Sequence, residues 1–298
     1  MNRKNLFLIL VVIPLIIFIS WYNGQSYAGV KGTDEHHHHH EHTPGLPEPI
    51  VDLETSPETI KAQEPATIVF YIKDSEGNPL QDIAIMHERI LHVVIVSEDF
   101  SIFGHIHPED FGPLTAEMKK KGRFAVDYTF SKAGRYLIAA DFGVKDLHFS
   151  KKFTINVSGE PGMNPLKKDF SREKDYSDYT VTLTSKPERI TAGKDSTLIY
   201  SIKKNGKAVT DLEPYLGEAM HLAIITADFN QFIHAHGDKP DASKGSDPMG
   251  HIHGMPHDKY GPEIEARVVF PVNGNYKIFS EIRHQGKVIL LDFMVTVE

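Results

Sequence analysis

The chain contains no cysteine among its 298 residues. This absence excludes disulfide bonds, iron–sulfur clusters, covalent haem attachment and anchoring through a lipidated cysteine. It also excludes a blue-copper electron-transfer site, because that centre needs a cysteine thiolate beside its histidines. Any transition metal held by this protein must therefore be bound by nitrogen, oxygen or thioether ligands.

A sustained basic stretch is also missing from the body of the chain, whose formal net charge is -8. Proteins that bind nucleic acid present clustered lysine and arginine to the phosphates, so we expect no nucleic-acid partner. A convincing amphipathic helix is missing as well. Short segments rich in β-branched and aromatic residues alternate instead with Gly, Pro, Asn and Asp turn signals, a pattern typical of all-β proteins.

What the chain has is a histidine pattern that occurs twice with the same spacing, as His92, His105 and His107 and then as His221, His234 and His236. The surrounding residues repeat too, as MHERILHVVIVSEDFSIFGHIHP and YLGEAMHLAIITADFNQFIHAHG. A lone histidine on a strand is usually a hydrogen-bonded surface residue. Retention of all three positions, while neighbours such as Gly104 and Ile233 differ, favours metal ligands.

Each histidine set is predicted to lie on a β-hairpin. A turn centred on Glu98 and Asp99 opposes His92 to His105, and His107 joins them because alternate residues of a strand share a face. Three imidazoles on one face can supply three ligands to a divalent ion. The second copy predicts the same pairing, with a turn at Ala227–Asp228 and with His221 opposed to His234.

The duplication and the chain length predict two domains of ordinary size. We expect an all-β fold of two tandem immunoglobulin-like or cupredoxin-like β-sandwiches, over residues 50–158 and 176–298, with a linker over residues 159–175. Residues 29–49 are predicted to be a flexible His- and Pro-rich linker that can chelate metal. Its run His36–His40 stands behind an intact export signal, which favours a native origin over an expression tag.

The N-terminal residues 1–28 read as an export segment. Arg3 and Lys4 precede an apolar run over 6–19, and a small-x-small cleavage motif ends at Ala28. The segment is predicted to be a cleaved signal peptide or an uncleaved transmembrane anchor. In either case the body is expected to be extracytoplasmic, secreted or tethered to the cytoplasmic membrane.

A further histidine-rich segment lies in the second half. The offset between the two copies grows from 129 to 140 residues after the second triplet, so the second domain carries an insertion there. Thioether and imidazole together suit copper in both oxidation states, although a passive solvated loop would also tolerate them. The candidate metal ligands of this insertion are Met249, His251, His253, Met255 and His257.

Carboxylates near the triplets are candidates for a fourth ligand or for a partner that orients an imidazole. Glu109 and Asp238 each follow a triplet by two residues. Asp141 and Glu281 occupy equivalent positions late in apolar strands, where an acidic residue is unexpected. Surface solvation is the usual role of each such carboxylate taken alone, and Asp141 with Glu281 is the first pair to test as a partner of the histidines.

The strings HERILHVVIVSEDFSIFGHIHPE, AMHLAIITADFNQFIHAHG and GPEIEARVVFPVNGNYKIFSEI resemble the extracytoplasmic YtkA-like domains. Those modules are similar in broad terms to the immunoglobulin-type copper-resistance proteins of the CopC kind. The resemblance implies an exported, often membrane-tethered protein of copper or heavy-metal handling, with the six triplet histidines at the matching positions. The chain departs from the CopC pattern, because its expected first mature residue is Gly29 instead of histidine.

The leading hypothesis is a non-catalytic protein that sequesters copper, confers resistance to it or delivers it. Cu(II) has the highest affinity among the divalent ions for nitrogen sites, and the Met-His insertion suits Cu(I) on delivery, so the second site is expected to exchange metal and the first to hold it. Zinc and nickel are the alternative metals. The expected partners are the metal ion and a membrane metal transporter or metalloprotein acceptor.

Two other functional classes stay open. One is a metal-dependent enzyme, similar to superoxide dismutase or to a binuclear metallohydrolase through its His-x-His motifs. The other is a structural or adhesive tandem sandwich whose histidines are incidental or sense pH. A specific metal site predicts that metal raises the melting temperature, whereas the structural alternative predicts no effect.

Overall fold

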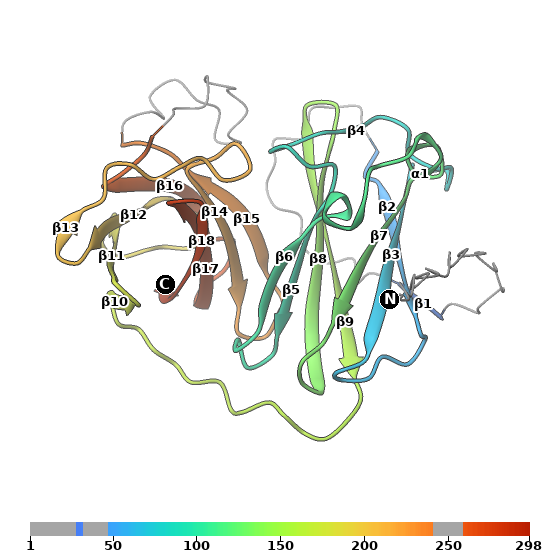
Figure 1. Ribbon diagram of the computed structural model, residues 1–298, viewed down its shortest axis with the longest axis horizontal. Coiled ribbons are helices and arrows are strands. Elements are labelled where there is room, and N and C mark those ends of the chain that lie inside the picture. Colours follow the sequence, from blue (N-terminus) through green and yellow to red (C-terminus); the bar gives the residue numbers. More distant parts are fainter. Residues whose placement is uncertain (1–27, 32–46, 241–258) are drawn as a thin grey trace, which may run out of the picture.

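The computed structural model describes residues 28–31, 47–240 and 259–298. Within these ranges almost every element is a strand, and two β-sandwiches stand next to each other (Figure 1). The predicted all-β tandem fold is confirmed. Of the predicted export segment 1–28 only Ala28 is described, and the predictions for the run His36–His40 and the segment Met249–His257 lie outside the described residues. In the described part of the chain, no helix has the length and apolar character needed to span a bilayer.

The first sandwich consists of two antiparallel sheets. One sheet has the strand order β1–β2–β3–β7, with β1 at Ala28–Lys31, β2 at Ile50–Ser56, β3 at Pro65–Lys73 and β7 at Arg123–Thr129. In the other sheet β5 lies between β6 and β8, and β8 also pairs with β9 and β4. Its strands are β4 at Ile83–Ala84, β5 at His92–Ser97, β6 at Phe103–Ile106, β8 at Gly134–Val144 and β9 at Leu147–Val157. A 3-10 turn, Pro108–Phe111, and a short helix α1, Ala116–Lys120, connect β6 to β7.

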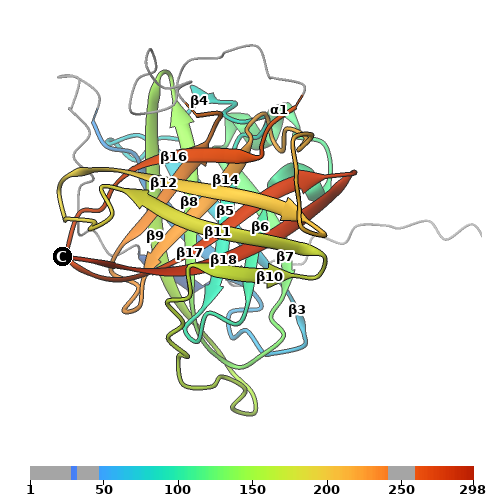
Figure 2. The same cartoon turned by 90° about the vertical axis from the view of Figure 1, so that its left-hand side faces the viewer.

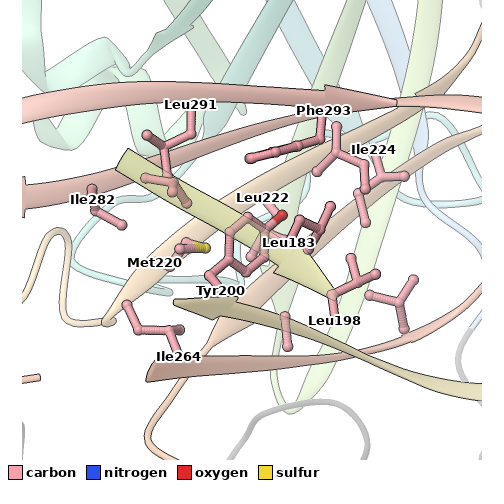
Figure 3. Packing of buried hydrophobic residues seen from close by; sticks show 14 of the residues in the cluster. Leu183, Leu198, Tyr200, Met220, Leu222, Ile224, Ile264, Ile282, Leu291 and Phe293 are labelled. Atoms are coloured by element: carbon pink, nitrogen blue, oxygen red, sulfur yellow. The ribbon is translucent and has the colours of Figure 1, made fainter. Parts of the chain in front are cut away.

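The second sandwich repeats this arrangement. Its outer sheet contains β10 at Glu173–Tyr176, β11 at Tyr179–Lys186, β12 at Asp195–Lys204, β13 at Lys207–Ala208 and β16 at Glu263–Val269. The other sheet has the order β15–β14–β17–β18, with β14 at Met220–Thr226, β15 at Phe232–Gly237, β17 at Gly274–His284 and β18 at Lys287–Val297. Side chains such as Tyr200, Leu222 and Phe293 fill the space between the two sheets (Figure 3).

The two histidine-bearing sheets face each other across the boundary between the sandwiches, and their strands cross obliquely in the view of Figure 2. Every residue of β5 is buried. Alternate residues of a strand point to opposite faces of the sheet, and both faces of this strand are covered. Val93 and Ile95 enter the core of their own sandwich, while Val94 and Val96 pack against the other sandwich. The continuous apolar run of β5 therefore reflects a strand that is covered on both faces.

The hairpin register differs from the predicted one by two residues. β6 places His105 opposite Val94 instead of His92, and β15 places His236 instead of His234 opposite His221. The cause is the turn, where the Asp99 carboxylate accepts hydrogen bonds from Ser97 and Ser101 and the next residue, Phe100, takes a positive φ of 55°. A shift of two residues preserves the side-chain face, so all three histidines still share one face.

Candidate metal centre

The six triplet histidines lie on the strand faces that meet between the two sandwiches. We call His92, His105 and His107 the first triad, and His221, His234 and His236 the second triad. Both are buried: His92, His107 and His221 are each 2% exposed or less, and the side chains of His105 and His234 are each 2% exposed. In each triad, one ring nitrogen from every histidine lies within 4.8 Å of the other two.

The first triad has the dimensions of a metal site. His92 Nδ1 lies 3.0 Å from His105 Nε2, and His107 Nε2 lies 3.2 Å and 3.3 Å from these two atoms. A tetrahedral ion with metal–nitrogen bonds of about 2.0–2.1 Å would separate neighbouring nitrogens by about 3.3 Å. The three nitrogens therefore already stand at nearly the spacing that such an ion requires.

The outer nitrogens of the first triad fix the protonation of the rings. His92 Nε2 donates to the Met86 carbonyl oxygen at 3.1 Å, an atom that can only accept. His105 Nδ1 donates to Glu281 Oε2 at 2.6 Å, and the Nδ1 atom of His107 donates to a carboxylate oxygen of Asp110 at 3.0 Å. In neutral rings these donors leave three lone pairs facing one another, an arrangement that a cation stabilises and that hydrogen bonds alone cannot satisfy.

The environment of His92 and His107 disfavours their protonation. Burial, with the neighbouring histidines, holds the pKa of His92 well below its usual value. Burial and the charge of His105 lower the pKa of His107 to about 3, against the opposing effect of Asp110. Neutral imidazole is the form that binds a metal ion, so His92 and His107 can bind a metal at neutral pH without losing a proton.

The second triad follows the same scheme. His221 Nε2 donates to the Tyr215 carbonyl oxygen at 2.9 Å, and His234 Nδ1 donates to Asp141 Oδ2 at 2.6 Å. The nitrogens left over, His221 Nδ1 and His236 Nε2, are buried and have no hydrogen-bond partner. An unpaired buried polar atom costs about 1–3 kcal/mol, a cost that a bound ion would offset. Burial lowers the pKa of His221 and of His236 well below the usual value.

The carboxylates Asp141 and Glu281 each contact a histidine of the other sandwich. In the strand ladders, Asp141 lies beside His92 and Glu281 beside His221. Their hydrogen bonds nevertheless cross the boundary, from His234 to Asp141 and from His105 to Glu281. Carboxylates in this position orient a ligating imidazole and increase its basicity.

The other two carboxylates that follow the triplets do not contact the triads. Glu109 Oε1 accepts a hydrogen bond from the backbone of Ile90, and Asp238 accepts one from the backbone of Lys239. Both residues are close to a triplet in sequence but bond elsewhere, because the chain leaves the histidine-bearing face directly after each triplet.

Three further residues of the site escaped the sequence analysis. Asp110 orients His107 from the adjacent 3-10 turn, and the i, i+3 spacing next to Pro108 was the available signal. His148 donates to Asp141 at 2.7 Å, and its counterpart in the second sandwich is Val288, so the repeat gave no hint of it. His87, from the turn before β5, packs against His236 in a tilted arrangement with ring centroids 3.8 Å apart.

Asp141 and His148 shift each other's pKa in opposite directions. Burial would raise the pKa of Asp141, but the charges and hydrogen bonds of His148 and His234 outweigh it and hold that pKa well below the usual value. Burial would lower the pKa of His148, but Asp141 raises it above the usual value. The three residues Asp141, His148 and His234 also lie within ligand distance of one another, although the shared oxygen Oδ2 already accepts from both imidazoles.

Solved structures that are similar to the chain have low similarity scores. The Escherichia coli adhesin FdeC has 14% sequence identity and a TM-score of 0.24, and the match covers 85% of this chain and 65% of that one. Invasin, a bacterial integrin-binding protein, has 13% identity and a TM-score of 0.21, covering 82% and 39%. Domains 4 and 5 of the S-layer protein SbsC have 11% identity and a TM-score of 0.21, covering 85% and 98%. The chain thus spans less than two thirds of the first two proteins, and scores this low carry no argument about function.

Comparison with curated protein sequences finds no match. Neither the structures above nor the family model below connects the chain to YtkA-like or CopC-like proteins, so that resemblance remains a prediction. The family model that matches describes a domain of unknown function and covers residues 47–159 and 174–298, which include both triads. The chain therefore belongs to the family defined by the domain of unknown function DUF8832.

Proposed function

We propose that this protein is an exported, non-catalytic metal-binding protein that holds one late first-row transition-metal ion in each histidine triad. Copper is the preferred ion, and zinc and nickel are the alternatives. The protein sequesters the metal outside the cytoplasm or passes it to a membrane transporter or a metalloprotein acceptor.

One observation carries this proposal. In the first triad, three buried nitrogens converge at 3.0–3.3 Å while each ring donates its other nitrogen to an oxygen that can only accept. Three imidazoles whose inner nitrogens converge and whose outer nitrogens are held by hydrogen bonds form a preorganised set of ligands. A structural sandwich without metal gains nothing from burying such a set.

The ligand chemistry favours copper. Affinity for nitrogen ligands rises along the first-row divalent ions to a maximum at Cu(II), and three imidazoles provide no thiolate that would favour zinc. The surroundings also favour storage or transfer over catalysis. A catalytic ion keeps an open position for water or substrate, whereas these histidines are covered by the facing sandwich.

The test is metal stoichiometry on the full-length chain after metal removal, measured by equilibrium dialysis with Cu(II) and Zn(II). The reference is a variant in which all six triad histidines are replaced by alanine, which keeps the histidines of the run His36–His42. We expect the wild-type chain to bind two more ions than this variant. Equal numbers would reject the proposal.

A matched control addresses histidine loss in general. His284 is also buried, but it bonds to Tyr179 and Asp211, away from both triads. The variant His284→Gln should bind as much metal as the wild-type chain. A loss as large as that of the triad variants would show that folding, and not ligation, controls the measured binding.

A further inference from the structure

Resting on the proposed function, we further propose that the two triads form one dinuclear centre between the sandwiches. Each sandwich supplies a carboxylate that orients a ligand of the other sandwich's ion. Metal binding and the docking of the two sandwiches are then one linked equilibrium.

The two sandwiches exchange carboxylates across their boundary. His105 of the first triad donates to Glu281 of the second sandwich, and His234 of the second triad donates to Asp141 of the first, both at 2.6 Å. The acceptor that sets the tautomer of each of these rings is present only when the sandwiches are docked. A separated sandwich would retain its three histidines but would lose the partner of one of them.

The two triads lie close to each other. Ring centroids within the first triad are 4.7–5.3 Å apart. Between the triads, His92 lies 5.3 Å from His234 and 5.9 Å from His221, and His105 lies 5.6 Å and 5.7 Å from the same two rings. The spacing between the triads is thus nearly the same as within them. The six rings form one cluster, and two bound ions would have ligand shells in direct contact.

Several carboxylates surround the histidine cluster. Two divalent ions held this close repel each other, and the repulsion is strong in a buried site. Four carboxylates bond or pair with histidines of the cluster and its rim: Asp110 with His107, Asp141 with His234, Glu281 with His105 and Glu218 with His87. Their formal negative charges offset part of the charge of two divalent ions, since Asp141 also pairs with His148 and Asp110 with Arg89.

An apolar contact between the two sheets brings the triads together. Beside the histidines the two sheets bury an apolar patch, in which Phe103 stacks on Phe279 with ring centroids 4.6 Å apart. Phe100 packs against Phe229 in the same patch. This apolar contact holds the sandwiches together and covers the rings, so an ion reaches or leaves its ligands when the contact opens. By reciprocity, an ion that requires the docked arrangement also stabilises it.

The experiment isolates each triad in the full-length chain and then removes the carboxylate of one sandwich. In a His92→Ala/His107→Ala background, which retains the second triad, Asp141→Asn should weaken Zn(II) binding about 10-fold or more. In a His221→Ala/His236→Ala background, which retains the first triad, Glu281→Gln should do the same. Each substitution should have the smaller effect on the triad of its own sandwich.

Asp127→Asn is the matched control, because this exposed carboxylate on β7 bonds to Thr67 and touches no histidine. It should leave both affinities unchanged. If each carboxylate affects mainly its own sandwich's triad, or neither triad, the dinuclear proposal is wrong while the proposed function stands. If neither background binds more metal than the six-alanine variant, both proposals are wrong.

Electron paramagnetic resonance gives a test that needs no change at the site. A chain with serine in place of the histidines of His36–His42 is loaded with two equivalents of Cu(II). We expect a spectrum broadened or weakened by coupling between the two ions, and an uncoupled spectrum when either triad is removed. A two-ion spectrum equal to the sum of the two single-site spectra would overturn the proposal, as would binding of one ion per chain.

Discussion

Asp141 of the first sandwich accepts a hydrogen bond from His234 of the second at 2.6 Å, and Glu281 accepts one from His105 across the same boundary. The two contacts are equivalent in the repeat, so the boundary has an approximate twofold relation between the sandwiches. A duplicated module can place two copies of one face against each other, as isologous interfaces do in dimers. Here both copies lie in one chain.

The symmetry is incomplete at two positions. Asp110, which orients His107, corresponds to Lys239 in the second sandwich. His148, which bonds to Asp141, corresponds to Val288. These differences give the two triads different electrostatic surroundings, and they lead to the first prediction.

We expect Asp110→Ala to weaken metal binding at the first triad alone. The Asp110 carboxylate accepts hydrogen bonds from both the backbone and Nδ1 of His107, at 2.8 Å and 3.0 Å. Loss of a carboxylate that orients a ligating histidine lowers metal affinity about 10–100-fold. Titration with Zn(II) in the His221→Ala/His236→Ala background measures this effect. Asp127→Ala serves as the control, and an equal loss at the second triad would contradict the prediction.

Two buried tyrosines provide a prediction about stability. The hydroxyl groups of Tyr136 and Tyr276 each donate at 2.8 Å to a carbonyl oxygen four residues earlier, at Lys132 and Val272. This arrangement is the tyrosine corner of immunoglobulin-type sandwiches. Replacement by phenylalanine leaves the carbonyl oxygen unpaired, so each variant should lose about 1 kcal/mol of unfolding free energy.

Chemical denaturation monitored by fluorescence or circular dichroism measures this loss. Tyr128→Phe is the control, because its hydroxyl forms no hydrogen bond within the described residues, and it should change stability little. A result in which all three variants behave alike would show that the corner bonds contribute nothing specific.

Much of the centre could be predicted from the sequence because strand periodicity is local. Spacing alone placed His105 and His107 on one face, and the duplication implied two such faces. The register was predicted wrongly, because the Asp99 carboxylate and the positive φ of Phe100 build a turn centred one residue later. Such turn chemistry involves side-chain hydrogen bonds that hydrophobic periodicity does not encode.

The contacts across the boundary could not be predicted from the sequence. The acidity of Asp141 and Glu281 inside apolar strands marked both as unusual. The partner of each carboxylate depends on how the sandwiches dock, which is set by the packing of Phe103, Phe279 and their neighbours. One signal was present in the unbroken apolar run of β5, which indicates a strand buried on both faces.

The last prediction concerns the stability of the metal-free protein at acid pH. The pKa values of five triad histidines, His92, His107, His221, His234 and His236, are lowered in the folded protein. The unfolded chain binds protons at these residues near pH 6.5, whereas the folded chain stays neutral there. The unfolded state therefore binds more protons, and stability falls as the pH drops below about 6.5. For His107 the loss continues until its folded pKa of about 3.

The size of the effect follows from linkage. Each such histidine contributes a slope of about 1.4 kcal/mol per pH unit once the unfolded residue is protonated. His148 acts in the opposite direction, because Asp141 raises its folded pKa and its stabilising contribution is lost as the pH rises. Five lowered pKa values against one raised pKa leave a net loss of stability on acidification. Urea denaturation of metal-free protein between pH 7.5 and 5.5 should show this fall in the free energy of unfolding. In the variant His92→Ala/His107→Ala the fall should be smaller by the contribution of about two histidines. A flat wild-type profile over this range would mean that the triads are already protonated or solvated in the folded chain.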